Sequence, residues 1–113
     1  MENVVERRMS ARVQVDCPSW AFVEGQRHPC RALDLSTSGM VVAASRTLAG
    51  RGMPDLGAFE IVLSAGRKVR ARTRTIWRDG RICAVRFVVI NDVDRLVIAE
   101  HVDDLAARGA IVH

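Results

Sequence analysis

Two short segments hold most of the side chains that could do chemistry. Arg7, Arg8 and Arg12 lie close together near the start, and an acid, three hydroxyls and a glycine follow in the segment 34–39. The planar, always charged guanidinium pairs bidentately with phosphate or a guanine edge and also stacks on a base. Together the two segments predict a receptor for an anion that also carries planar, hydrogen-bonding rings.

The composition predicts one soluble globular domain over residues 1–113. Hydrophobic residues make up 49% of the chain and charged residues 27%, values that are ordinary for a packed domain. The formal net charge is +4, and sixteen of the seventeen basic residues are arginine. This balance favours anionic partners without identifying one.

The lengths of the apolar segments and the spacing of the cysteines indicate the cellular compartment of the protein. No segment approaches the roughly 20 apolar residues of a membrane span, and the charged N-terminus lacks the apolar run of a signal peptide. The odd number and wide spacing of Cys17, Cys30 and Cys83 argue against a disulfide framework. His28 lies two positions from Cys30, but no Cys-x-x-Cys pair is present, so buried thiols are favoured over a metal site. We predict a cytoplasmic protein without a bound metal.

Alternating apolar and polar residues predict several short strands. The expected strands are 12–15, 20–24, 29–35, 40–44 and 59–63, with a bend at 16–19 and turns at 24–27 and 64–66. The segment 48–57 contains three glycines and a proline, so it is expected to be one long irregular connection.

The clearest predicted hairpin pairs 69–77 with 82–90 through Asp79-Gly80, a strong hairpin signal. On the first strand one face carries Val69, Ala71, Thr73, Thr75 and Trp77, and the other, predicted to face water, carries Arg70, Arg72 and Arg74. On the second strand the expected inward residues are Cys83, Val85, Phe87 and Val89, with Arg86 outward.

The fold class follows from the number of strands and from a change of period near the end. About six or seven short strands in so short a chain favour a closed or nearly closed barrel, because closure removes exposed edges. Residues 92–108 show helical spacing, with Asp92 as the expected N-cap and Gly109 as the stop. The expected apolar stripe is Val93, Leu96, Val97, Val102 and Leu105, packed on the barrel or, alternatively, on a partner protein.

These motifs resemble those of the PilZ domain, the bacterial receptor family for cyclic di-GMP. Arg8 and Arg12, preceded by Arg7, fit an Arg-x-x-x-Arg motif, and the segment 34–39 fits an Asp/Asn-x-Ser-x-x-Gly motif. The segments 75–77 and 81–87 are similar to the family's second hairpin, in which a tryptophan ends one strand and a Gly-Val-Arg-Phe-like stretch follows. Ala84 stands where glycine is common, which we interpret as a change in a packing position. The resemblance spans about residues 6–102.

The resemblance implies an all-β fold, a six-stranded antiparallel β-barrel with a C-terminal α-helix, and no catalysis. It divides the chain into a flexible ligand-wrapping segment, 1–12, a barrel, 12–90, and a helix, 92–108. The ligand, cyclic di-GMP, often bound as an intercalated dimer, lies outside the barrel, and no cofactor is expected. The implied ligand-binding residues are Arg7, Arg8, Arg12, Asp34, Ser36 and Gly39.

Each of these residue types suits that ligand. Arg8 and Arg12 would contact guanine and phosphate, with an added contact from Arg7. Asp34 could accept from the guanine N1 and N2 hydrogens, and Ser36 could offer its hydroxyl to the ligand or to its own backbone. Gly39 would permit a backbone angle or a close approach that a side chain would block. An alternative left open is that Asp34 and Ser36 are simple turn formers.

Three other functional classes remain as alternatives. RNA or single-stranded DNA binding needs exposed aromatics interleaved with charge, and it is disfavoured because Trp77 and Phe87 are assigned to inward faces. A PilZ-like adaptor that recognises a protein and no nucleotide is disfavoured by the intact motifs. An enzyme is the least expected, since His28, His101 and His113 lie in unrelated contexts without a nucleophile nearby.

The expected mechanism is a ligand-driven switch. Without nucleotide, repulsion among the arginines should leave the N-terminal segment mobile. Binding would neutralise this charge and order the segment, creating a surface that a separate partner protein recognises. Control of motility, surface polysaccharide or biofilm formation is the type of output expected.

Overall fold

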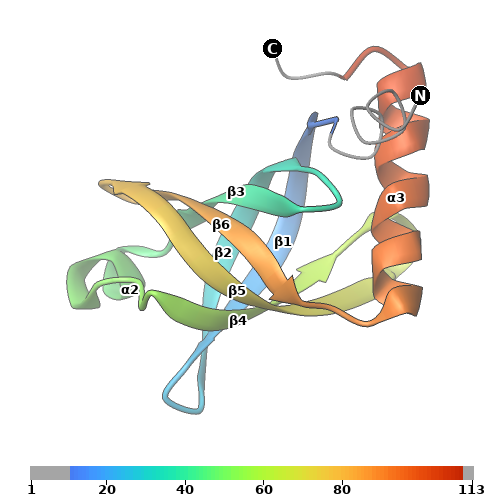
Figure 1. Cartoon of the computed structure of the whole chain (residues 1–113). Helices are drawn as coiled ribbons and strands as arrows, with labels where there is room; N and C mark the ends of the chain where they lie inside the picture. The colour runs from blue at the N-terminus through green and yellow to red at the C-terminus, as the bar shows by residue number, and fades with distance from the viewer. Residues whose placement is uncertain (1–10, 111–113) are drawn as a thin grey trace.

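The computed structural model describes residues 11–110, which form a closed antiparallel barrel followed by a helix (Figure 1). Around the barrel the strands are ordered β1-β2-β3-β6-β5-β4, and β4 pairs with β1 to close it. The predicted six-stranded barrel with a C-terminal helix is confirmed. The elements are β1 (Val13–Val23), β2 (Gln26–Leu35), β3 (Gly39–Ala44), α2 (Arg46–Arg51), β4 (Leu56–Val62), a 3₁₀ turn (Ser64–Gly66), β5 (Lys68–Asp79), β6 (Ile82–Val89) and α3 (Asp92–Ala107).

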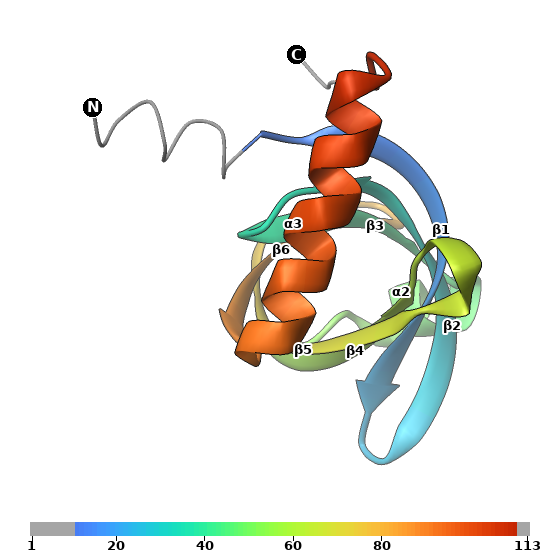
Figure 2. The same ribbon diagram turned by 90° about the vertical axis from the view of Figure 1, so that its right-hand side faces the viewer.

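Helix α3 crosses one end of the barrel and covers it (Figure 2). Ile98 and Val102, one turn apart, are buried in the same core as the inward residues of the strands. The predicted apolar stripe is therefore only partly right. Val102 is buried, but Val93 and Leu96 are 68% and 58% exposed. The face of α3 that is buried against the barrel is therefore narrower than the predicted apolar stripe.

The ends of α3 also refine the prediction. Asn91, and not Asp92, is the N-cap, because its side chain accepts a hydrogen bond from the Asp94 amide at 2.7 Å. At the other end Gly109, with a φ of 87°, takes the left-handed conformation after the helix stops, as expected.

Two predicted interruptions are regular structure. The expected bend at 16–19 lies inside β1, and irregular pairing between Gln14 and Cys17 accommodates the extra residue there. In the segment predicted as irregular, α2 begins after Ser45, whose hydroxyl accepts from the Leu48 amide at 3.2 Å. Leu48 is fully buried, and Gly52 ends the helix with a φ of 88°. Gly52 therefore marks a helix end, Gly57 lies in β4, and the irregular connection is reduced to residues 52–55.

The two hairpin turns are tighter than predicted. Only Glu24 and Gly25 separate β1 from β2. Between β5 and β6, Asp79 still pairs with Ile82, so the turn consists of Gly80 and Arg81. Gly80 has a φ of 60° at the first turn position, where a two-residue hairpin favours glycine.

The three cysteines are buried and unpaired, and burial raises the pKa of each thiol above its ordinary value. None of the helices within residues 11–110 has the length and apolar character needed to cross a membrane.

A pH dependence of stability is expected from His101, which lies on α3 beside β1. Burial lowers its pKa from the ordinary 6.5, against a smaller opposing effect of Asp104. Since the unfolded chain then binds a proton more readily, the free energy of unfolding should fall as the pH drops below 6.5. His101→Gln should reduce this acid loss, measured by urea unfolding at neutral and mildly acidic pH. Equal acid loss in both proteins would contradict the prediction.

Candidate functional site

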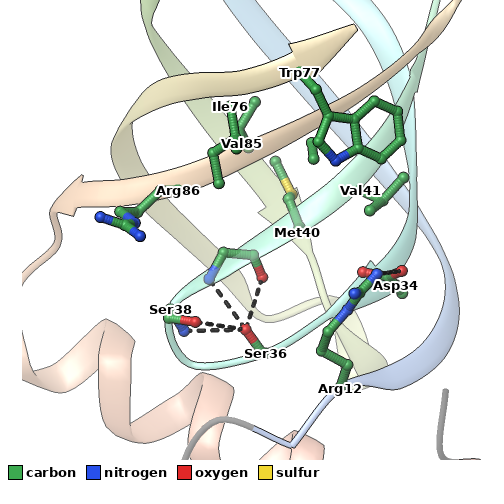
Figure 3. A pocket seen from close by; sticks show the side chains of 12 residues that line it. Arg12, Asp34, Ser36, Ser38, Met40, Val41, Ile76, Trp77, Val85 and Arg86 are labelled. Atoms are coloured by element: carbon green, nitrogen blue, oxygen red, sulfur yellow. Dashed lines mark hydrogen bonds and ion pairs between the residues drawn. The ribbon is translucent and has the colours of Figure 1, made fainter. Parts of the chain in front are cut away.

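A cavity of about 210 Å³ opens on the outside of the barrel, between the end of β2, the start of β3, the last part of β5 and the middle of β6 (Figure 3). It brings together four of the predicted site residues. Arg7 and Arg8 lie outside the residues that the structure describes, so their placement remains a prediction. The lining is Arg12, Asp34, Ser36, Ser38, Gly39, Met40, Val41, Ile76, Trp77, Ala84, Val85 and Arg86.

The two motifs meet directly at this cavity. The Arg12 guanidinium donates a hydrogen bond to the Asp34 carboxylate at 2.5 Å, across 22 positions of sequence. The Asp34 side chain is only 12% exposed, whereas that of Arg12 is 49% exposed. The carboxylate therefore orients a guanidinium that still presents part of its fork to solvent.

An irregularity in β2 places Asp34 outside the barrel. From His28 to Ala32 the even-numbered residues of β2 are the buried ones, but the pairing with β3 shifts between Ala32 and Asp34. After this shift Leu35 is fully buried in the core, and Asp34 lines the external cavity. A bulge of this kind re-aims the side chains that follow it.

Ser36 organises the turn that carries the second motif. Its hydroxyl oxygen accepts hydrogen bonds from the amides of Ser38 and Gly39, each at 3.2 Å, and its own amide donates to the Gly39 carbonyl at 2.9 Å (Figure 3). The turn-former alternative therefore describes Ser36 as it stands in this structure. Asp34 differs, since its carboxylate is engaged by Arg12.

Gly39 allows β3 to approach β6 closely. A Cβ at this position would lie 2.3 Å from the Val85 carbonyl oxygen, much closer than any normal contact. The φ of Gly39 is not in the left-handed region, so the close approach is the reason for glycine, and the backbone angle is not. The glycine thereby keeps the turn against β6, where the Ser38 carbonyl accepts from the Phe87 amide at 2.9 Å.

The inward assignment of Trp77 is wrong. The pairing of β5 with β6 shifts between Thr75 and Trp77, so Ile76 is an extra residue and the alternation changes face. Trp77 is 47% exposed and lines the cavity together with Ile76. A second shift in the same pairing lies between Arg72 and Thr73, where β6 has an extra residue between Phe87 and Val89. Val89, predicted to face inward, is therefore 59% exposed.

Two residues of β6 complete the cavity. Ala84 pairs with Trp77 and is 7% exposed beneath the opening, so it belongs to the site and not only to packing. Arg86 pairs with Gly39 and has no ion pair within the described part of the chain. Both lie in the stretch 84–87 whose likeness to Gly-Val-Arg-Phe was the available sequence signal.

Comparison with known proteins gave matches among solved structures. No family model and no curated protein matches the sequence. The Bacillus subtilis inhibitor of motility MotI/DgrA superimposes with a TM-score of 0.76 at 14% identity, over 90% of this chain and 52% of that one. The PilZ domain of CeSA from a cellulose-synthesizing bacterium gives a TM-score of 0.63 at 18% identity, over 86% and 99% of the two chains. This chain has the PilZ fold.

A third neighbour has the same PilZ-like barrel. It is an uncharacterized Legionella protein with a TM-score of 0.60 at 12% identity, covering 87% of this chain and 96% of that one. The chain spans about half of the length of the Bacillus subtilis protein. The likeness establishes the fold, which the resemblance of the motifs had predicted.

The electrostatics of this PilZ barrel favour an anion at the cavity. The lining contains two guanidinium groups, of Arg12 and Arg86, one carboxylate, of Asp34, and the exposed indole ring of Trp77; Arg12 lies beside Asp34, and Arg86 lies across the cavity from them (Figure 3). Guanidinium groups bind phosphate, and an indole offers a plane on which a base can stack. The arrangement suits binding of a nucleotide by charge and stacking together.

The arginines at positions 70, 72 and 74 of β5 are exposed and do not line this cavity, as predicted. Arg70 donates to the buried carboxylate of Glu60 at 2.9 Å, and Arg27 lies 3.7 Å from the other oxygen of Glu60. Part of this arginine face is therefore engaged by the protein itself.

Proposed function

We propose that this chain binds cyclic di-GMP at the cavity around Arg12 and passes the binding signal to a separate protein, without catalysis. The observation that carries the proposal is the Arg12–Asp34 ion pair, because it joins the two motifs of the PilZ resemblance at one opening. The exposed face of Trp77 beside them supplies what a base needs and a plain anion does not.

The proposed contacts follow from the groups available. Asp34 would accept from the N1 and N2 hydrogens of one guanine through the oxygen that Arg12 leaves free. Arg12 and Arg86 would contact phosphate, and Trp77 would stack on a guanine. The cavity is smaller than the roughly 300 Å³ of an enclosing ligand pocket, so much of the dinucleotide would lie outside it. We propose that Arg7 and Arg8 cover that part.

A backbone contact offers a route for the signal. The Gln14 amide, two residues after Arg12, donates to the Ala110 carbonyl at 2.8 Å, just beyond the end of α3. A change in the segment before β1 would therefore act directly on the end of the helix that covers the barrel. We propose α3 as the element through which a partner senses the ligand.

Calorimetric titration tests the proposed ligand against its main rival. Because Trp77 is exposed, it could also stack on a base of single-stranded nucleic acid. An unlabelled single-stranded RNA therefore belongs in the same assay. We expect heat with cyclic di-GMP and little with the RNA at the same nucleotide concentration. Tight RNA binding, or no heat with cyclic di-GMP at tens of micromolar, would contradict the proposal.

Trp77→Ala should weaken binding of cyclic di-GMP by about 1–3 kcal/mol, the usual value of one stacked base. Because about half of the residue is buried, the free energy of unfolding should also fall, so the titration should be done at a temperature where the variant is folded. The matched control is Trp20→Ala, since the ring of Trp20 is covered by Arg27, with the guanidinium carbon 4.3 Å from the ring centroid, outside the cavity. An equal loss of affinity in both variants would show that stacking on Trp77 is not involved.

A further inference from the structure

A second recess, of about 450 Å³, lies on the outside of the barrel where β4, β5 and β6 meet the start of α3. Its apolar lining includes Phe22, Ala58, Val89 and Ile90, and two guanidinium groups, of Arg70 and Arg72, belong to its wall. It shares no residue with the cavity around Arg12. We refer to these six residues as the Val89 groove.

The apolar part of the groove continues along the chain into exposed apolar residues of α3. Val89 is 59% exposed, and Val93 and Leu96, in the first turns of α3, are 68% and 58% exposed. The register shift between Arg72 and Thr73 is what turns Val89 outward. Val93 and Leu96 belong to the helix whose N-cap, Asn91, borders the groove, and exposed large apolar residues near a recess mark an interaction surface more often than scattered single ones do.

Of the two arginines beside the groove, Arg70 forms an ion pair within the described structure and Arg72 does not. Arg70 is held by Glu60, whose side chain is only 5% exposed, and part of its charge is neutralised there. Arg72 is exposed and takes part in no ion pair between residues that the structure describes. An approaching carboxylate would therefore find its favourable partner at Arg72, next to the apolar lining.

We propose that the Val89 groove binds a segment of another protein, which packs an apolar side chain against Phe22 and Val89 and places a carboxylate on Arg72. An apolar anchor in a pocket with a charged group at its rim is the usual composition of such contacts. The proposal stands independently of the proposed nucleotide, since no residue is shared between the two sites.

Three other occupants fit these observations less well. A second copy meeting through the same surface would bring like-charged Arg70 and Arg72 groups together. RNA binding would need exposed aromatic rings interleaved with the charge, but of the two rings in the lining Phe59 is 2% exposed and Phe22 is partly covered by Arg70. An anionic membrane surface would lie against Asp92 and Asp94 in the first turn of α3 as well as against Arg72, whereas a single peptide carboxylate can contact Arg72 alone. A protein segment with mixed chemistry avoids all three difficulties.

Selection from a random peptide library displayed on phage tests this proposal directly. We expect the full chain to enrich peptides that combine large apolar residues with Asp or Glu. Val89→Asp and Arg72→Glu should each weaken binding of an enriched peptide by about tenfold or more. The matched controls are Leu56→Asp, at an equally exposed apolar position (60%) outside the groove, and Arg67→Glu on the neighbouring turn, and both should bind normally.

The outcomes separate this proposal from the others. No enrichment, enrichment of basic peptides, or peptides that bind Val89→Asp as well as the wild type would overturn it. Preferential binding of single-stranded RNA or of phosphatidylglycerol vesicles, lost in Arg72→Glu, would also overturn it. Cyclic di-GMP binding should be unchanged in Val89→Asp, so failure of either proposal can be recognised without the other.

Discussion

Arg12→Ala is expected to remove most of the affinity for cyclic di-GMP. The variant loses a guanidinium that would contact the ligand, and it leaves the Asp34 carboxylate, 12% exposed, without its cation beside the incoming phosphates. Charge-assisted hydrogen bonds are worth about 1.5–3 kcal/mol each, so a loss of roughly tenfold to over a hundredfold is expected. Calorimetric titration measures it, and Arg8→Ala should behave similarly.

Two controls accompany Arg12→Ala: its free energy of unfolding, and the ligand affinity of a variant at an arginine outside the cavity. The Arg12 side chain is 49% exposed, but its removal leaves the mostly buried Asp34 carboxylate unpaired, so the free energy of unfolding should fall by about 1–3 kcal/mol, and the titration should be done where the variant is folded. Arg72→Ala, which removes an exposed arginine outside the cavity, should bind the ligand almost normally. If Arg72→Ala lost as much affinity as Arg12→Ala, the nucleotide site would be misplaced.

Gly39→Ala is expected to destabilise the barrel strongly. The new Cβ would lie 2.3 Å from the Val85 carbonyl oxygen, a backbone atom that cannot move away without separating β3 from β6. Forced overpacking of this kind costs about 2 kcal/mol or more. For a domain of this size the Tm should fall by roughly 8 °C or more, which thermal unfolding followed by circular dichroism measures.

Gly57→Ala is the matched control, because Gly57 also lies in a strand but has room for a methyl group. Its nearest neighbours to a new Cβ would be at 3.7 and 3.8 Å, which is ordinary contact. The Tm of Gly57→Ala should therefore stay near that of the wild type or rise slightly. A similar loss of stability in both variants would show that strand glycines are needed for a general reason and not for the β3–β6 contact.

The predicted site residues that the structure brings to one cavity belong to local motifs. Asp34 and Ser36 lie in a turn whose serine bonds to amides two and three residues later, a pattern that needs no distant contact. The resemblance predicts that Arg12 and Asp34 belong to one ligand site, but it does not predict a direct contact between them. In the structure they share one ion pair.

The residues whose facing was predicted wrongly lie where the pairing between strands is irregular, and strict alternation along one strand does not reveal such irregularities. Strict alternation predicts that Trp77 and Val89 face inward, yet one extra residue in each pairing turns them outward. The need for glycine at position 39 depends on which carbonyl of β6 lies opposite, and this is a matter of non-local register. In α3, Val93 and Leu96 fit the apolar spacing of the helix, yet both are exposed and do not pack on the barrel.

Amide NMR spectroscopy during a titration with cyclic di-GMP tests the central claim most directly. The chain has two tryptophans, Trp77 at the cavity and Trp20 outside it, so their indole N–H signals report on the site and on an internal control. We expect the Trp77 indole and the Ser38 and Gly39 amides to shift, while the Trp20 indole stays in place. Shifts at Trp20 with none at Trp77, or no shifts at all, would contradict the account.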